Sequence, residues 1–328
     1  MGNYPIEKWE KYGILWLIFL NGEKTMIKFK PFTLEDRALY RQYLTQSDER
    51  GCEFSFANLF LWGRQRFAVV HDHVVLFSQF DRRTVYPWPV GDGEKKPVLD
   101  AIIEDAAARG IPCRLTGLKD ADIELLQQLY PDRFRFHCDR GNYDYVYDID
   151  DLADLKGRKY QKKRNHYNRF RAANPHCEVV PLNGGNVAAA KEMVDRWYRE
   201  KLEVDPQSDL QMEQAAIYKA LQCWQDLQME GLVLMEGDQV LAVTMGSFLS
   251  EDTVDVHFEK AVSTVDGAYT AINCEFARYI RSKYPRVRFL NREEDMGLEG
   301  LRKAKESYLP HHMVQKCWAH LKEEGYDY

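Results

Sequence analysis

Residues 156–171 read KGRKYQKKRNHYNRFR and contain eight Lys or Arg residues and no Asp or Glu. At helical spacing, Tyr160, Tyr167 and Phe170 fall on one side. The other side carries Lys159, Lys162, His166 and Arg169. Because solvated helix faces usually mix charge signs, this segment predicts a helix that binds phosphate on a cofactor, a tRNA acceptor arm or a lipid headgroup. A plain solvated charged face is the alternative.

The elements expected before and after this segment follow the same order. In the first half, we expect strands or hairpins at 27–31, 67–80 (turning near Asp72), 84–89, 113–116 and 143–147, and helices at 34–45, 96–109 and 121–129. In the second half, we expect helices at 155–173, 187–202, 211–228, 269–283 and 298–306, and strands or hairpins at 178–181, 233–248, 253–261, 287–290 and 313–319. Strands alternating with helices predict a mixed α/β fold that is duplicated, with a boundary near 148–156.

The composition is that of a globular protein long enough for two domains, since 328 residues include 45% hydrophobic and 29% charged side chains. The net charge of −6 excludes attraction of the whole molecule to nucleic acid or anionic lipid. The scattered cysteines contain no C-x-x-C pair, which argues against a disulfide framework and a zinc site. We therefore expect buried, reduced thiols and a cytoplasmic protein; the cysteines are Cys52, Cys113, Cys138, Cys177, Cys223, Cys274 and Cys317.

The N-terminal segment needs separate treatment. Its apolar stretch at 13–20 is too short to span a bilayer, and Met26 is a second start followed at once by a strand pattern. We expect 1–25 to be a non-native or disordered extension, 26–150 to form an N-terminal domain, and 151–328 to form a C-terminal domain with the active site. No transmembrane segment is expected.

Residues 253–260, TVDVHFEK, alternate cleanly between apolar and polar side chains. This pattern predicts a strand with Asp255, His257 and Glu259 on one face. A row of such groups is costly to bury without partners, so we expect it to line a cleft, where His and Glu suit proton transfer. An exposed strand face with ordinary polar residues is the alternative.

Two loops are further candidates. The stretch NREED, at 291–295, follows a predicted strand, where it would either grip a cationic amine or cap the helix at 298–306. The stretch TVDGAY, at 264–269, places Gly267 before a helix, as an anion site or as a plain turn. No Walker loop, G-x-G-x-x-G, H-E-x-x-H or G-x-S-x-G motif occurs, which removes nucleotide hydrolysis, zinc chemistry and nucleophile-type hydrolysis as leading hypotheses.

The stretches GRKYQKKRNHYNRF, HFEKA with G-A-Y downstream, and NREEDMGLEGLRKAKESYLP together resemble one family. They are similar to uncharacterised bacterial proteins related to the C-terminal catalytic domain of phosphatidylglycerol lysyltransferases, from Met26 to about Leu321. The resemblance implies two tandem GNAT-like (N-acetyltransferase-like) acyltransferase domains with mixed central sheets, as in Fem aminoacyltransferases. Two features differ from relatives of known chemistry: the turn AVSTVDGA at 261–268 has a single glycine, and no membrane helix is expected before the domain.

The resemblance implies attack by an amine or hydroxyl on an activated carbonyl, with acyl-CoA or aminoacyl-tRNA as donor and no metal. We expect His257 or Glu259 as base and Tyr308 or Tyr269 as proton donor. Donor phosphates would meet Lys159, Lys162, Lys163, Arg164, Gly267, Ala268 and Tyr269. The acceptor, a small-molecule or peptide amine, would meet Asp255, Asn291, Glu293 and Glu294. Expected partners include tRNA and a peripheral membrane contact; the alternative is a non-catalytic module that binds a phosphate-rich partner.

Overall fold

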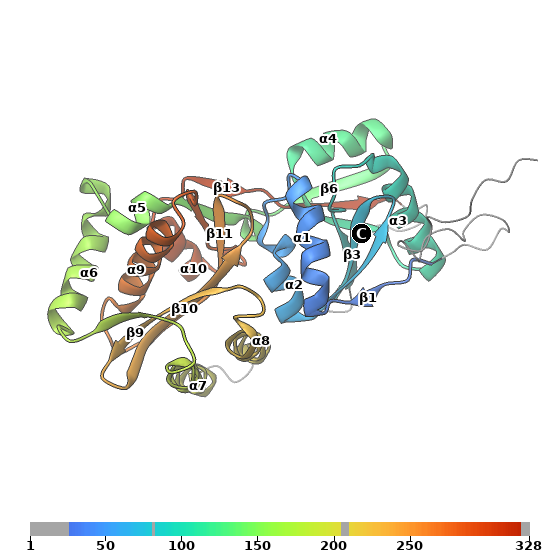
Figure 1. Cartoon of the computed structure of the whole chain (residues 1–328). Helices are drawn as coiled ribbons and strands as arrows, with labels where there is room; N and C mark the ends of the chain where they lie inside the picture. Colours follow the sequence, from blue (N-terminus) through green and yellow to red (C-terminus); the bar gives the residue numbers. More distant parts are fainter. Residues whose placement is uncertain (1–25, 81–82, 205–209, 323–328) are drawn as a thin grey trace, which may run out of the picture.

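The computed structural model describes residues 26–80, 83–204 and 210–322, so the expected extension at 1–25 lies outside the described residues. Two lobes lie side by side, each built on a mixed sheet of seven strands (Figure 1). The expectation of a mixed α/β fold with two similar halves is confirmed. None of the described helices is long and apolar enough to cross a membrane.

The first sheet has the order β1-β2-β3-β4-β5-β14-β6. Its strands are β1 (Lys30–Pro31), β2 (Gln65–Val70), β3 (His73–Phe80), β4 (Arg83–Pro87), β5 (Arg114–Leu118), β6 (Phe134–Cys138) and β14 (Cys317–Leu321). Its helices are η1 (Leu34–Asp36), α1 (Arg37–Gln46), η2 (Cys52–Phe54), α2 (Phe56–Trp62), α3 (Lys95–Arg109), α4 (Asp120–Leu129) and η3 (Arg140–Asn142). The predicted hairpin turns at His71 and Asp72, which both adopt positive φ.

The second sheet has the order β13-β7-β12-β11-β10-β9-β8. Its strands are β7 (Asp144–Asp148), β8 (Glu178–Pro181), β9 (Glu230–Glu236), β10 (Gln239–Phe248), β11 (Thr253–Ala261), β12 (Phe289–Asn291) and β13 (His312–Val314). Its helices are α5 (Ile149–Asp154), η4 (Arg158–Tyr160), α6 (Gln161–Ala173), α7 (Val187–Val204), α8 (Leu210–Cys223), α9 (Ala268–Lys283) and α10 (Glu299–Glu306). An apolar cluster joins α9 to one face of this sheet, and α5 and α6 pack against α9.

The two sheets exchange strands. The sequence predicts one strand at 313–319, but the chain divides it between the lobes: β13 pairs with β7, whereas β14 inserts between β5 and β6. In return β7, from the first half of the chain, pairs with β12 and β13 in the second sheet. The division into domains at 26–150 and 151–328 remains a prediction. The exchanged strands link the two lobes at any such boundary.

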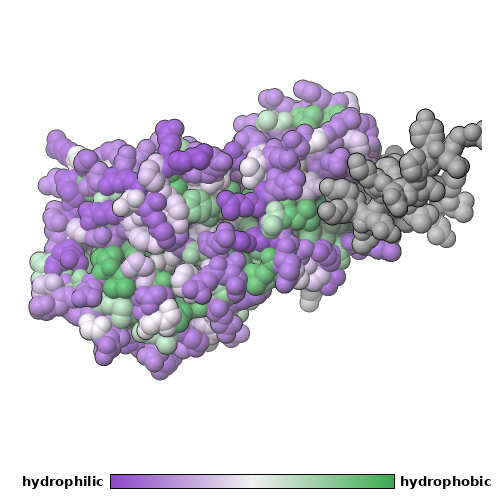
Figure 2. All heavy atoms as spheres, in the orientation of Figure 1, coloured by the Kyte–Doolittle hydropathy of each residue, from purple (hydrophilic) through white to green (hydrophobic). Residues whose placement is uncertain are grey.

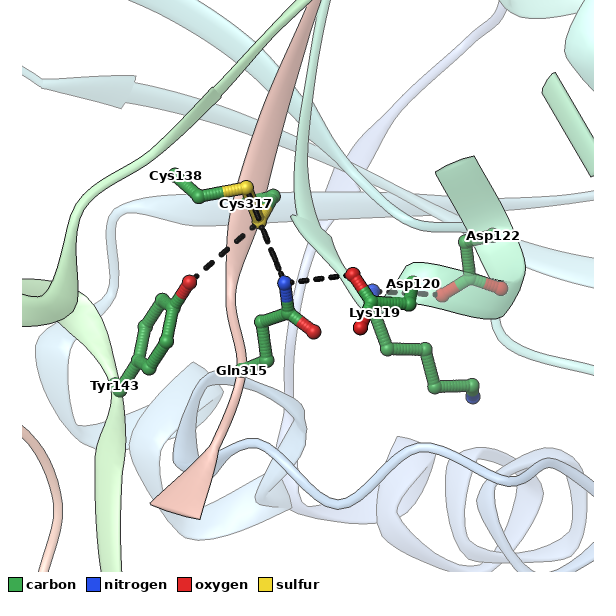
Figure 3. The surroundings of a disulfide bond; sticks show 7 residues. All are labelled: Lys119, Asp120, Asp122, Cys138, Tyr143, Gln315 and Cys317. Atoms are coloured by element: carbon green, nitrogen blue, oxygen red, sulfur yellow. Dashed lines mark hydrogen bonds between the residues drawn. A yellow bond between two sulfur atoms is a disulfide. The ribbon is translucent and has the colours of Figure 1, made fainter. Parts of the chain in front are cut away.

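A disulfide joins β14 to β6 (Figure 3). Cys317 lies opposite Cys138 in the antiparallel register, and the Nε2 atom of Gln315 lies 3.3 Å from the Cys317 sulfur. The expectation of reduced thiols is wrong for this pair, because strand pairing brings together cysteines 179 residues apart in the chain. The other cysteines are thiols outside this disulfide, and all of them except the half-buried Cys223 are buried.

A β-bulge in β11 overturns the expected alternation of its side chains. Against β10, Met245 pairs with Phe258 and Gly246 pairs with Val256, so His257 is the extra residue. Beyond the bulge, Phe258 joins the apolar cluster of α7 and α8 rather than that of α9. Glu259 turns to the α9 face instead, where the Asn273 amide donates a hydrogen bond to it. Asp255, His257 and Glu259 therefore do not share one face.

Candidate active site

The strands β11 and β12 run parallel but pair only over three residues, ending at Asp255 and Asn291. Beyond that point β11 continues to Ala261 while the chain leaves β12 as the loop 292–295. Consecutive side chains of this loop serve different faces: Arg292 contacts Glu259 on the α9 face, and Glu293 approaches His257 on the face toward the first lobe. The loop that follows the paired segment therefore sends side chains to both faces of the sheet.

The loop is held in an uncommon backbone conformation. Glu293 has φ of +58°, a region that residues other than glycine rarely adopt. Its N–H donates to the Asn291 side-chain oxygen at 2.8 Å. The ammonium of Lys305, on α10, donates to the carbonyls of Arg292, of Glu293 at 3.0 Å and of Glu294 at 2.7 Å. Burial lowers the pKa of Lys305, although the adjacent acids oppose this effect.

The first group of polar side chains, here called the His257 cluster, consists of Asn58, Ser247, Asp255, His257 and Glu293. His257 Nε2 lies 2.8 Å from Ser247 Oγ. His257 Nδ1 lies 3.4 Å from Asp255 Oδ2 and 3.5 Å from Glu293 Oε1. The Asn58 amide, on α2 of the first lobe, donates to Glu293 Oε1 at 3.0 Å. Both lobes therefore contribute to the cluster.

The His257 cluster has more buried acceptors than donors. Among the described residues, Asp255 Oδ1, Asn58 Oδ1 and His257 Nδ1 have no hydrogen-bond partner. Burial and the neighbouring Glu293 raise the pKa of Asp255 well above its usual range. Buried polar atoms without partners are costly, so this arrangement suits a ligand that brings a proton or a positive charge.

Two sets of residues have the spacing of metal ligands: Asp255, His257 and Glu293 form one, and Cys52, Glu53 and Asp144 form the other. The second set already surrounds an ammonium group, because Lys316 Nζ lies 2.5 Å from Asp144 Oδ1 and 2.9 Å from Glu53 Oε2. The first set has no such cation among the described residues.

The group around Lys316, here called the Lys316 cluster, adjoins the His257 cluster. It also contains Glu294, whose Oε2 lies 3.4 Å from the ammonium. Asn291 donates to Asp144 Oδ2 at 2.9 Å and so links the two clusters. Although burial opposes its charge, the surrounding acids, Asp144 first, raise the pKa of Lys316 well above its usual range. Lys316 therefore stays charged and joins both halves of the chain.

A third group, here called the Glu259 cluster, lies on the α9 face of the sheet. It consists of Lys163, Glu259, Asn273, Arg292 and Tyr308. Arg292 lies 2.9 Å from Glu259, and Lys163 Nζ lies 3.5 Å from the centre of the Tyr308 ring. Burial and the neighbouring Arg292 lower the pKa of Lys163 to about 8. Burial raises the pKa of Tyr308, so its phenol stays protonated at neutral pH. This cluster gathers three predicted site residues that are far apart in the sequence.

The other residues predicted to meet donor phosphate lie away from this cluster. Lys159 pairs with Asp151 at 3.0 Å, and Arg164 donates to the carbonyls of Leu155 and Gly157. Lys162 faces outward beside an open hollow of about 490 Å³ on α6, within a largely hydrophilic surface (Figure 2). The hollow is lined by Lys162, Asn165, His166, Asn168 and Arg169.

The turn before α9 has a packing role. A Cβ atom on Gly267 would lie 2.5 Å from the backbone oxygen of His166, so this glycine lets α6 pack closely on the start of α9. Ala268 is buried behind it, and the Tyr269 hydroxyl accepts a hydrogen bond from the Trp197 indole at 3.0 Å. Of the residues predicted to meet donor phosphate, only Lys163 lies in the Glu259 cluster.

A cavity of about 750 Å³ opens between α1 of the first lobe and the β10–β11 connection of the second. Ser247 of the His257 cluster lines it, together with Arg37, Arg41 and Arg50. Among the described residues, neither Arg37 nor Arg41 has a carboxylate within ion-pair distance, and burial and the neighbouring Arg41 lower the pKa of Arg37. Sequence reasoning missed Asn58, Ser247 and Lys316, which carry no local pattern.

The two mixed sheets and the helices that cover them form a tandem GNAT-like fold. Its sequence matches the family model described as "Phosphatidylglycerol lysyltransferase, C-terminal" over residues 44–320. The chain belongs to this family, which confirms the resemblance inferred from the sequence. No curated protein matches the sequence.

Several solved structures have a similar fold. A conserved protein of unknown function from Bacteroides thetaiotaomicron is 38% identical, with a TM-score of 0.85 over 90% of this chain and 100% of that one. L-PGS from Bacillus licheniformis is 14% identical, with a TM-score of 0.63 over 88% and 93%. An acetyltransferase of the GNAT family from Colwellia psychrerythraea is 10% identical, with a TM-score of 0.50 over 90% and 100%. The last two likenesses concern the fold.

Proposed function

We propose that this chain moves an acyl or aminoacyl group from an activated donor to an amine or hydroxyl acceptor. The observation that carries the proposal is the position of the His257 and Glu259 clusters at the end of the β11–β12 pairing, joined through Arg292 and Glu293. One cluster is rich in acids, and the other carries two cations and a protonated phenol. This division suits an acceptor amine on one side and an activated carbonyl with its phosphate-bearing carrier on the other.

The acceptor side must turn an ammonium into a neutral nucleophile. Asp255 and Glu293 would attract the ammonium, and His257 would take its proton, because its buried Nδ1 has no hydrogen-bond partner among the described residues and lies near both acids. Asn291 and Glu294 support this side indirectly, since Asn291 holds the Glu293 backbone and Glu294 pairs with Lys316. Small-molecule or peptide amines are the proposed acceptors.

The donor side must hold negative charge and release the carrier. Lys163 and Arg292 would meet phosphate or the developing oxyanion, and Tyr308 would donate a proton to the leaving group. Glu259 has Arg292 as its ion-pair partner, which supports His257 as the base and Glu259 as the group that orients Arg292. Lys159, Lys162 and Arg164 would contact more distant phosphates, as the long acceptor arm of a tRNA would provide.

Aminoacyl-tRNA and acyl-CoA are both proposed donors, and a thermal-shift screen separates them. Protection by a CoA thioester identifies the small donor. Tight tRNA binding that weakens steeply with salt identifies the nucleic-acid donor. Both donors are cytoplasmic molecules, so the cytoplasm is the proposed location. A count of reactive thiols in protein purified under anaerobic conditions tests this location, because a disulfide such as Cys138–Cys317 is rare there.

The second candidate function is a non-catalytic module that binds a phosphate-rich partner. The hollow on α6 favours it, because Lys162 and Arg169 line that hollow. Under this function, the charge reversal Lys162→Glu would abolish partner binding, whereas His257→Ala would leave binding unchanged. The wild-type chain would show no acyl transfer with either donor. A matched reversal at Lys303, an exposed residue of α10 that pairs with the exposed Glu299, is the control.

A further inference from the structure

The cavity between the lobes ends on a serine that is already in contact with an imidazole. Ser247 is 6% exposed and lines the cavity, and its Oγ lies 2.8 Å from His257 Nε2. The other imidazole nitrogen faces the Asp255 carboxylate at 3.4 Å. A hydroxyl, an imidazole and a carboxylate in this order form the arrangement that activates a serine as a nucleophile.

Local backbone geometry produces this contact. Ser247 and Asp255 are paired across β10 and β11, so their side chains share a face. The bulge at His257 turns the imidazole to the same face, between the serine and the acid. Gly246 makes the close approach possible, because a Cβ there would lie 2.6 Å from the Asp255 carbonyl oxygen. The bulge and this glycine together assemble three residues that the sequence does not mark as a motif.

The surroundings favour a reacting group over a purely structural hydrogen bond. His257 Nδ1 and Asp255 Oδ1 are buried and have no hydrogen-bond partner among the described residues. Two carboxylates, Asp255 and Glu293, are in place to stabilise an imidazolium that forms when the serine loses its proton. Arg37 and Arg41, on the cavity wall, would meet negative charge on the molecule that enters. In this route the acyl compound reaches the serine through the cavity, and not from the Lys163 and Arg292 side that direct transfer would use.

We propose that Ser247 is a covalent nucleophile that accepts the acyl group from an activated ester or thioester. Its Oγ bonds to the carbonyl carbon while its proton passes to His257 Nε2, and the carbonyl electron pair moves to oxygen. When the intermediate collapses, the bond to the carrier breaks and the carrier leaves with the proton from His257, which takes the place of Tyr308 as proton donor in this route. An amine, hydroxyl or water then attacks the acyl-serine, gives its proton to His257, and Ser247 regains that proton as it is released. For the identity of the acyl group, this inference rests on the proposed function.

The test uses the full chain with two probes. An alkyl fluorophosphonate should label Ser247, identified by peptide mass spectrometry, and a p-nitrophenyl ester should give a burst of about one nitrophenol per chain. Ser247→Ala and His257→Ala should each slow labelling and ester turnover by at least roughly 10³-fold. Ser250→Ala, which removes another serine from the same cavity wall, should keep both rates. Ser247→Cys should regain an ester burst, and thermal melts of all variants check that each folds.

The outcomes separate this inference from the proposed function. Absence of labelling in the wild-type chain, labelling at Ser250 instead, or full acyl transfer by Ser247→Ala overturns the covalent role, and the last result leaves direct transfer intact. Labelling at Ser247 without transfer to any amine or hydroxyl acceptor supports the nucleophile and contradicts the proposed transferase function.

Discussion

Replacing Lys316 with methionine is expected to destabilise the protein strongly. Its ammonium lies 2.5 Å from Asp144, 2.9 Å from Glu53 and 3.4 Å from Glu294, and its side chain is 9% exposed. Methionine fills similar space but leaves these acids without their cation. Breaking a buried ion pair from one side costs about 3–5 kcal/mol. The matched control, Lys303→Met, removes an exposed lysine that pairs with Glu299, and should cost less than about 1 kcal/mol.

Urea unfolding followed by circular dichroism measures the difference between the two variants. The deficit of Lys316→Met should shrink as the pH falls, because protonation removes the repulsion among the stranded carboxylates. Adding Asp144→Asn should restore part of the lost stability, because one buried charge is then removed. A loss below about 1 kcal/mol for Lys316→Met, or no recovery in the double variant, would refute the view that this lysine joins the lobes.

Three further results are expected. Burial raises the pKa of Glu49 to about 7 from an ordinary value of 4.5, so the folded state binds more protons than the unfolded state between these pH values, and stability falls as the pH rises across them. Glu49→Gln should therefore be more stable than the wild type by roughly 1–3 kcal/mol at pH 8 and by little at pH 4, as measured by urea unfolding. Because the pKa of Lys163 is about 8, donor affinity should fall as the pH rises from 7 to 9, whereas Lys163→Arg should keep its affinity in the same titration. Gly267→Ala combines a φ of +79° with a clash against the His166 backbone and should cost roughly 2–4 kcal/mol, against about 1 kcal/mol for Gly237→Ala, which has positive φ and free space.

Periodicity predicted the local elements well. The helix at 96–109, the hairpin turning at Asp72 and the strand at 253–261 all appear close to their expected limits. Each depends on neighbouring residues: a 3.6-residue apolar repeat, a short polar turn, and a two-residue alternation. The shorter β6 and α2 were missed, because so few residues do not establish a period.

Errors arose where one residue or a distant partner decides the structure. A single extra residue at His257 reverses the faces beyond it, and alternation alone cannot reveal that. The exchange of β14 and the Cys138–Cys317 disulfide depend on pairing across more than 170 residues. The charged segment at 156–171 continues into a helix from Gln161 to Ala173. Only its Lys163 lies in the Glu259 cluster, whereas its other cations bond to backbone carbonyls, pair with acids or face solvent.

The candidate site was therefore only partly predictable. His257, Glu259 and the loop 291–295 stood out because charged residues in a strand and after it break the usual pattern. Ser247 and Lys316 sit singly among ordinary residues and gain meaning only from their contacts. A site built from residues of both lobes cannot be recognised from any one stretch of the sequence.

Single-turnover acyl transfer tests the central claim most directly. The wild-type chain is mixed with a radiolabelled donor, either an aminoacyl-tRNA or an acyl-CoA, and with a panel of amines and hydroxyl compounds, and labelled product is followed over time. We expect transfer with one donor class, and a loss of at least roughly 10²-fold in both His257→Ala and Glu259→Gln. Full transfer by both variants would contradict the assignment of the active site to the end of the β11–β12 pairing.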